Sequence, residues 1–160
     1  MALAYDTDNE RAFQELLTRY PSKKAALLPA LRLAQRQWSF LSLEVMEYVA
    51  ERLELAPAEV RNTATFYTMF KKAPIGKVHV QVCTNLSCYL RGSDELMALC
   101  EKKLGIHPGH TTADGVFTLD HVECLASCGT APMMQVNDDY YENLTPAQVE
   151  GLLEGWRKAG

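Results

Sequence analysis

The first half of the chain carries apolar residues at the spacing of an amphipathic α-helix. Four such stretches begin near residues 7, 22, 42 and 57. The third is the clearest: it starts behind Ser42 as a candidate cap, and its apolar positions form one stripe of Val45, Met46, Val49, Ala50 and Leu53. We expect the stripes of all four helices to pack together as the core of a helical bundle.

Other residues indicate where these helices begin and end. Thr7 and Asp8 are the candidate caps of the first helix. Pro29 lies inside the second pattern, so we expect a kink or a fresh start of the helix there. Pro57 suits the first turn of the fourth helix, whose apolar residues continue as far as Phe70.

The pattern changes after residue 70. Residues 71–77 interrupt the helical spacing with a proline and a glycine, which predicts a linker. Residues 78–82 then alternate apolar and polar positions as a β-strand, and the strand ends at Cys83. Because His79 alternates with the valines of this strand, we expect its side chain to face solvent.

A helix and a second strand follow. Ser93 is the expected cap of the helix and Gly105 its stop. Residues 116–123 have the pattern of a strand that ends at Cys124. A parallel crossover through the helix brings the ends of both strands to the same edge of the sheet, so we expect the cysteines at these ends to lie close together.

The last part of the chain predicts a hairpin and a helix. Asp138-Asp139 is the expected two-residue turn between strands at residues 133–137 and 140–143. Thr145 and Gln148 have the spacing of a capping box for the final helix.

The fold class follows from the order of these elements. Residues 78–158 are predicted to run β-α-β-β-β-α, which is a thioredoxin-like order, and an all-helical segment precedes them. The chain is therefore predicted to be α+β, with an N-terminal helical bundle at residues 1–73 and a thioredoxin-like domain at residues 74–160.

Composition and charge narrow the possible functions. The 160 residues are 48% hydrophobic and 22% charged, which is typical of a globular protein. A net charge of −4, with no run of more than two basic residues, argues against binding to nucleic acid. The N-terminus lacks a basic start and no apolar stretch approaches the ~18 residues of a membrane span, so we expect a cytoplasmic protein without membrane insertion.

Five cysteines in a chain without a signal peptide favour metal or redox chemistry over disulfides. Four of them form two close pairs, Cys83-x4-Cys88 and Cys124-x3-Cys128, and two such pairs can hold the two irons of a 2Fe-2S cluster. A structural zinc site is the alternative, and it is less favoured because zinc pairs more often close over two intervening residues. Cys100 lies in a helical stripe and is expected to be a small buried side chain.

No other set of residues predicts a catalytic site. The chain has no nucleophile with its base, no phosphate-binding loop and no dinucleotide fingerprint. His107, His110 and His121 are expected to be structural rather than ligands. Chemistry on a substrate is therefore expected to come from a partner.

The cysteine motif resembles that of a known family. Gly92 follows the first pair, and the second pair lies in the sequence Val-Glu-Cys-Leu-Ala-Ser-Cys-Gly-Thr-Ala-Pro at residues 122–132. Together with Ala-Thr-Phe-Tyr at residues 64–67 of the helical half, these features resemble the thioredoxin-like 2Fe-2S subunit of NADH:quinone oxidoreductase, respiratory complex I. The resemblance covers nearly the whole chain.

The resemblance implies a cofactor, its ligands and a partner. In that family a helical bundle precedes a ferredoxin domain, and four cysteines, which correspond here to Cys83, Cys88, Cys124 and Cys128, carry one 2Fe-2S cluster. The family's subunit docks on a flavoprotein subunit that holds FMN and oxidises NADH. The chain is thus expected to transfer electrons as a subunit of an oxidoreductase, to be inactive as an enzyme alone, and to be peripheral to the inner membrane through the assembled complex. Related subunits serve NAD-linked hydrogenases and formate dehydrogenases, and this alternative stays open.

Residues around the cysteines are candidates for tuning such a cluster. Backbone N–H groups of residues 84–87 and 126–129, with the Ser87 and Ser127 hydroxyls, are candidate donors to sulfur that would raise its potential. Arg91 is either a source of positive charge or a solvated arginine. Ala126 stands where relatives commonly have glycine, and if the position needs a positive φ, alanine costs about 1–2 kcal/mol there.

Overall fold

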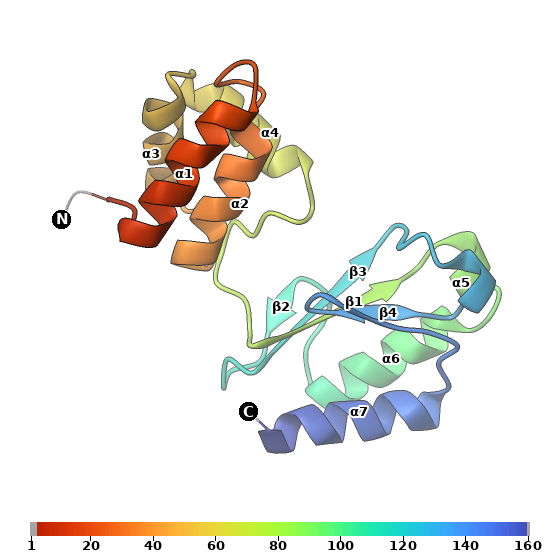
Figure 1. The fold of residues 1–160 in the computed structure, drawn as a ribbon. Helices are drawn as coiled ribbons and strands as arrows, with labels where there is room; N and C mark the ends of the chain where they lie inside the picture. Colours follow the sequence, from red (N-terminus) through yellow and green to blue (C-terminus); the bar gives the residue numbers. More distant parts are fainter. Residues whose placement is uncertain (1–2, 160) are drawn as a thin grey trace. The chain divides into compact units, whose positions relative to one another are not determined.

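The structure of the protein is a computed structural model that describes residues 3–159 (Figure 1). The chain divides into two compact units, one that ends at Pro74 and one that begins at Ile75. Seven α-helices and a five-stranded mixed sheet are found in this part of the chain, which confirms the α+β class. Within residues 3–159, no helix combines the length and the apolar character that crossing a membrane requires.

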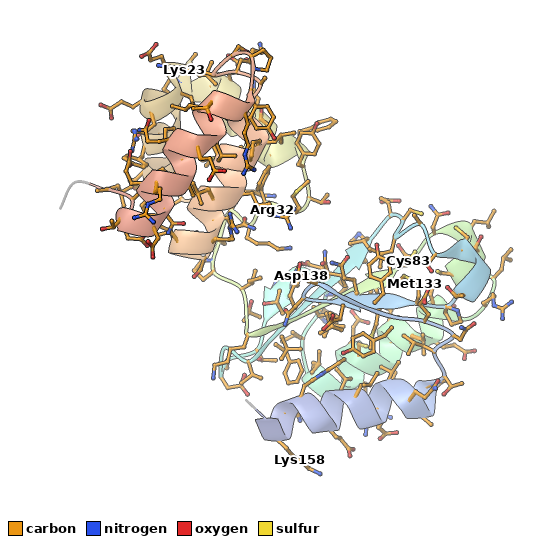
Figure 2. The ribbon with its side chains drawn as sticks, viewed as in Figure 1. Lys23, Arg32, Cys83, Met133, Asp138 and Lys158 are labelled. Atoms are coloured by element: carbon orange, nitrogen blue, oxygen red, sulfur yellow. The ribbon has the colours of Figure 1, made fainter. Side chains whose placement is uncertain are left out.

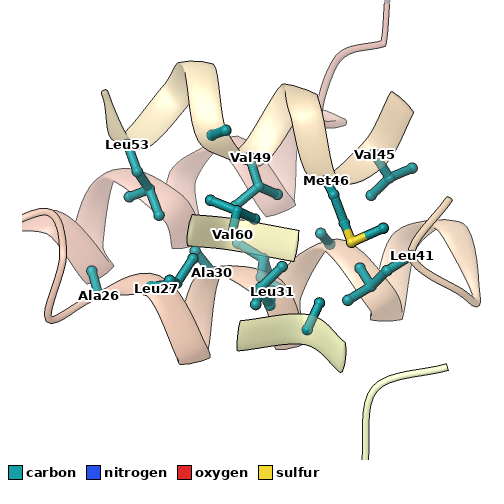
Figure 3. Close-up of a cluster of buried hydrophobic side chains, with 14 of the residues drawn as sticks. Ala26, Leu27, Ala30, Leu31, Leu41, Val45, Met46, Val49, Leu53 and Val60 are labelled. Atoms are coloured by element: carbon teal, nitrogen blue, oxygen red, sulfur yellow. The ribbon is translucent and has the colours of Figure 1, made fainter. Parts of the chain in front are cut away.

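The N-terminal unit is a helical bundle. Its helices are α1 (Thr7–Arg19), α2 (Leu27–Trp38), α3 (Leu43–Leu53) and α4 (Pro57–Phe66). The apolar stripe of α3 is buried along its whole length and meets side chains of α2 and α4 in one core (Figure 3). The predicted stripe and its cap are therefore confirmed, because the Ser42 hydroxyl accepts the N–H of Val45 at 3.2 Å.

Two helix boundaries in this unit, the start of α1 and the end of α4, differ in detail from the prediction, and the fresh start predicted near Pro29 is confirmed. Asp6, rather than Thr7 or Asp8, caps α1, and its carboxylate accepts the Asn9 N–H at 2.8 Å. Pro29 lies in the first turn of α2, where its missing N–H costs nothing, so the helix starts afresh there as expected. α4 ends at Phe66, although the apolar pattern continues to Phe70, since the buried Phe70 ring reaches the core from the turn beyond the helix.

The C-terminal unit is built on a sheet of strand order β2-β3-β1-β4-β5. β1 (Val78–Cys83) runs parallel to β3 (Phe117–Val122), with Cys83 opposite Val122. β2 (His110–Thr111) pairs antiparallel with β3, and β4 (Met134–Val136) and β5 (Asp139–Tyr141) form a hairpin beside β1. The parallel crossover predicted for the two longest strands is confirmed.

Two long helices, α6 (Ser93–Leu104) and α7 (Pro146–Ala159), cover one face of this sheet (Figure 1). The core between them and the sheet contains alternate residues of the central strands together with one side of each helix: Val80, Val82, Phe117, Leu119, Met134, Val136, Leu96, Cys100, Val149 and Leu153. Cys100 is fully buried in this core, so the prediction that it is a small buried side chain is confirmed. Burial raises the pKa of its thiol to about 12.

Several local features of this unit were predicted only in part. The short helix α5 (Leu86–Tyr89) and the two-residue strand β2 were not predicted. Gly92, at φ 90°, occupies the cap position of α6, and Ser93 is its first helical residue. The hairpin turn consists of Asn137 and Asp138, one residue earlier than predicted, because Asn137 adopts a left-handed φ of 54°.

The capping box of the last helix is confirmed. The Thr145 N–H donates to the Gln148 side chain at 2.8 Å, and the Gln148 N–H donates back to the Thr145 hydroxyl at 3.4 Å.

The prediction that His79 faces solvent is wrong. Only 2% of its surface is exposed, and its Nε2 lies 2.5 Å from a carboxylate oxygen of Asp120 on the neighbouring strand. The alternation along β1 correctly predicts that His79 lies on the opposite face of the sheet from the valines that face α6 and α7. It does not reveal which groups lie on that opposite face. Asp120 stabilises the buried imidazole by hydrogen bonding to it.

Candidate metal centre

Cys83 and Cys88 form a buried pair at one end of the sheet. Cys83 is the last residue of β1, Cys88 lies in α5, and Ala131 and Met133 pack against both in a small apolar cluster. Figure 2 labels Cys83 and Met133 at this end of the sheet. The Cys83 N–H donates to the Met133 carbonyl at 3.2 Å, so strand pairing as well as packing fixes this pair.

The short helix α5 orients Cys88. Asn85 caps it by accepting the Leu86 N–H at 2.9 Å, and the Arg91 N–H closes it by donating to the Cys88 carbonyl at 3.1 Å. Burial, followed by a hydrogen bond with Cys83, raises the pKa of the Cys88 thiol to about 11. The two cysteines of the first pair belong to the same buried cluster.

Cys124 and Cys128 lie on an exposed loop after β3. The Ala126 N–H donates to the Cys124 sulfur at 3.2 Å, so one of the predicted backbone donors to sulfur is present. Ala126 has a φ of 61°, which confirms that its position uses the left-handed conformation. Cys128 begins a single turn of 3-10 helix that ends at Thr130.

The two pairs lie on neighbouring loops because their strands are parallel neighbours. The Thr84 N–H, directly after Cys83, donates to the Val122 carbonyl at 3.0 Å and ties the two loops together where they leave the sheet. The parallel register, with Cys83 opposite Val122, brings the two pairs to the same end of the sheet.

The donor set matches the chemistry of a 2Fe-2S cluster, which takes four cysteine thiolates. Four thiols in two pairs, on loops from adjacent parallel strands, fit that requirement in number and kind. Within residues 3–159, no three histidine, cysteine or carboxylate side chains converge tightly enough to hold one metal ion. The assignment of the four thiols as ligands remains a prediction.

Other residues predicted to act near the cysteines have different positions. The Ser127 hydroxyl donates to Glu142 instead of to sulfur. Arg91 is exposed beyond the end of α5, and His121 is exposed on β3. Glu142 was not predicted, because it lies 14 residues after Cys128 and only the fold brings it back to this loop.

The surface beside the first pair is apolar. Leu86, Tyr89 and Leu90 are 67%, 57% and 74% exposed, and they belong to α5 or follow it directly. Large apolar side chains exposed beside a candidate redox site form a candidate contact surface for another protein. A four-residue helix is too short for its periodicity to reveal this exposure in the sequence.

The fold and the site together define a thioredoxin-like ferredoxin. The chain belongs to the family described as thioredoxin-like [2Fe-2S] ferredoxin, whose family model matches residues 13–157. Membership in this family supports a 2Fe-2S cluster as the cofactor.

Within this family the chain is similar to curated proteins that are named as one particular subunit of NADH-quinone oxidoreductase. The proteins from Rickettsia typhi and Rickettsia prowazekii are 47% and 49% identical over 154 residues, which cover 94% of this chain and 91% and 87% of theirs. A protein from Rhizobium meliloti, named as a second form of the same subunit, is 48% identical over 141 residues, 88% of this chain and 84% of its own.

A solved structure shares the fold. The chain superposes on a crystal structure of an NAD+-reducing [NiFe]-hydrogenase in the air-oxidized state with a TM-score of 0.71 and 22% sequence identity. The superposition covers 81% of this chain and 23% of the hydrogenase chain, so this chain spans about a quarter of that protein.

Proposed function

We propose that this chain is the 2Fe-2S electron-transfer subunit of an NADH-quinone oxidoreductase. The observation that carries the proposal is the identity of nearly one half, over almost the full length, with proteins named as a subunit of that enzyme. The hydrogenase shares the fold at a much lower identity, so the quinone-linked assembly is favoured over a hydrogenase. The chain would be peripheral to the inner membrane, on its cytoplasmic side, through the assembled complex.

Cys83, Cys88, Cys124 and Cys128 would hold the cluster, which supplies a one-electron redox centre when bound. The first pair, buried under Ala131 and Met133, excludes water from its side of the site. The second pair, on an exposed loop, leaves the other side open to a partner.

The redox partner would be a flavoprotein subunit that binds NADH and FMN. This chain has no dinucleotide fingerprint, so NADH oxidation and the separation of its two electrons would belong to the partner's flavin. The exposed apolar side chains of Leu86, Tyr89 and Leu90 would be covered by that partner. Docking there would bring the partner's electron donor next to the loop that joins the first two cysteines.

The ligand assignment is tested by replacing each of the four cysteines with alanine. Each variant should lose or badly perturb the cluster, since each removes one of four bonds to iron. Cys100→Ala, a buried cysteine in the core behind the sheet, is the matched control and should keep the cluster. Iron and sulfide assays with visible absorption measure the outcome.

Two results would contradict the assignment. One is a normal cluster in Cys124→Ala. The other is a colourless protein that contains zinc and no iron, which would make the site structural.

The partner assignment is tested in the complex. Dithionite should reduce the cluster of the purified chain, whereas NADH alone should not. Cross-linking in the native assembly should join the loops at residues 83–88 and 124–128 to the flavoprotein. Both loops found open to solvent in the assembly would refute electron exchange with the flavin and favour a free ferredoxin.

A further inference from the structure

The loop that carries Cys124 and Cys128 has little packing of its own. Both cysteines and Ala126 are exposed. Between the two cysteines, only Leu125 packs against an apolar cluster. The left-handed φ of 61° at Ala126 adds a strained residue. A loop with so few apolar contacts needs polar contacts to keep one conformation.

Glu142, just after β5, makes those contacts. Its Oε1 accepts hydrogen bonds from the Ser127 and Thr130 hydroxyls, whose oxygens lie 2.6 Å apart. Thr130 is tied to Ser127 a second time, because its N–H donates to the Ser127 carbonyl at 3.1 Å. One carboxylate thus binds both ends of the turn that contains Cys128.

The backbone of the two residues after Glu142 also forms hydrogen bonds to the segment that follows Cys128. The Asn143 N–H donates to the Thr130 carbonyl at 2.7 Å, and the Leu144 N–H donates to the Pro132 carbonyl at 3.0 Å. The segment 142–144 therefore anchors residues 127–132, and Glu142 is the member of that segment that reaches the cysteine loop itself.

Glu142 also carries a negative charge. The hydrogen bonds from Ser127, and next from Thr130, lower the pKa of its carboxyl, so the group is ionised at neutral pH. A negative charge close to an anionic cluster disfavours the addition of an electron.

We infer that Glu142 is a positioning residue for the second cysteine pair: its bonds to Ser127 and Thr130 hold the Cys124–Cys128 loop in the shape that presents both thiols. Its charge in addition lowers the reduction potential of the bound cluster. The inference rests on the proposed ligation by these cysteines.

Two variants of Glu142 separate its bonds from its charge. Glu142→Gln keeps an oxygen that accepts from both hydroxyls and removes the charge. Glu142→Ala removes both. Glu123→Gln is the matched control, since Glu123 is an exposed carboxylate directly before Cys124 and no hydrogen bond of its side chain is found among residues 3–159.

The first measurement needs no cluster. Hydrogen exchange of residues 124–131 in the metal-free protein should be roughly fivefold faster in Glu142→Ala than in the wild type, the factor for losing one net hydrogen bond. Glu142→Gln and Glu123→Gln should exchange at the wild-type rate. Equal rates in the wild type and Glu142→Ala would overturn the positioning role.

The second measurement uses the protein with its cluster. Glu142→Ala should release iron to a chelator roughly fivefold faster than the wild type, by the same argument. Glu142→Gln should release it at the wild-type rate but show a higher midpoint potential, and Glu123→Gln should leave the release rate unchanged. A wild-type potential in Glu142→Gln would overturn the effect of the charge.

The two measurements keep this inference separate from the proposed function. If the wild type binds no cluster, the proposed ligation fails, and hydrogen exchange still decides whether Glu142 holds the loop.

Discussion

Single residues at the cysteine loops depart from their local preferences. Ala126 adopts a left-handed φ of 61° that costs an alanine about 1–2 kcal/mol. The loop can keep this conformation because contacts on both sides determine it: the Ala126 N–H donates to the Cys124 sulfur, and the neighbouring Ser127 is held by Glu142. Strain of this kind is concentrated at functional sites, which agrees with the position of this loop between two proposed ligands.

Another residue with a specific role lies in the helical bundle. The Arg52 guanidinium donates two hydrogen bonds to the Glu10 carboxylate, at 2.8 and 2.7 Å, and one to the Tyr48 hydroxyl at 2.7 Å. It also lies 4.4 Å from the centre of the Phe13 ring. Glu10 therefore links α1 to α3 through a bidentate ion pair.

This pair predicts a pH dependence of stability. The hydrogen bond from Arg52 is the main cause that lowers the pKa of Glu10 from its ordinary 4.5 to about 2. The stabilisation by the ionised carboxylate is thus fully present above pH 4.5 and is lost as the pH falls towards 2. Glu10→Gln should lower the melting temperature at neutral pH, and the difference from the wild type should shrink in acid.

Thermal unfolding followed by circular dichroism at neutral and acidic pH measures this difference. Glu15→Gln is the control on the same helix, since Glu15 pairs with Arg19 in an exposed i,i+4 ion pair that contributes little. A difference between Glu10→Gln and the wild type that is constant with pH would contradict the prediction.

At the scale of elements, α5 is the part that local rules describe least well. Four residues cannot form a stable helix alone, so α5 depends on the Asn85 cap and on the burial of Cys88 against Cys83. The same arrangement turns Leu86, Tyr89 and Leu90 outward. α5 therefore orients a proposed ligand on one side and presents an apolar surface on the other.

This surface predicts the effect of charged substitutions on assembly. Leu86→Asp and Leu90→Asp should each weaken binding to the flavoprotein by about tenfold or more, because they place a charge in an apolar interface. The visible spectrum of the cluster should not change, since both side chains are largely exposed and neither belongs to the buried cluster around Cys83 and Cys88. Binding affinity to the purified flavoprotein is the measurement.

Leu43→Asp is the control for these variants. Leu43 is 55% exposed at the start of α3 in the other unit, where an acidic residue suits the helix N-terminus. If all three variants bind the flavoprotein as the wild type does, α5 is not part of the interface.

At the scale of the whole molecule, the chain consists of two units with separate cores. The helical unit is small, and a core of its size rarely supplies more than about 3–5 kcal/mol of stability. It also exposes Phe66, the last residue of α4, by 78%, and Met69, in the turn that follows, by 49%. We expect this surface to gain stability by packing against another protein of the assembly.

Hydrogen exchange over residues 3–74, compared between the isolated chain and the native assembly, tests this expectation. Protection should rise in the assembly, most of all in the last turn of α4 and the residues that follow it. Equal protection in both samples would show that the bundle is stable by itself and is not an interface.

The sequence by itself determined the features that depend on neighbouring residues. The α3 stripe behind Ser42, the capping box at Thr145 and Gln148, and the strands that end near Cys83 and Cys124 were all predicted correctly. Caps and periodicity act over one or two turns of chain, so a short window of sequence contains all the information. The parallel crossover predicted through the helix then placed both cysteine pairs at one edge of the sheet, as the parallel register of the two strands confirms.

Only the tertiary structure decided how each side chain near the site is used. His79 is paired with Asp120 instead of facing solvent, and Ser127 is bound by Glu142 instead of donating to sulfur. The first cysteine pair is buried and the second is exposed, although the two have similar spacing in the sequence. Each of these outcomes depends on groups that are distant along the chain and come into contact only after the sheet has formed. A local sequence pattern contains no information about such long-range contacts.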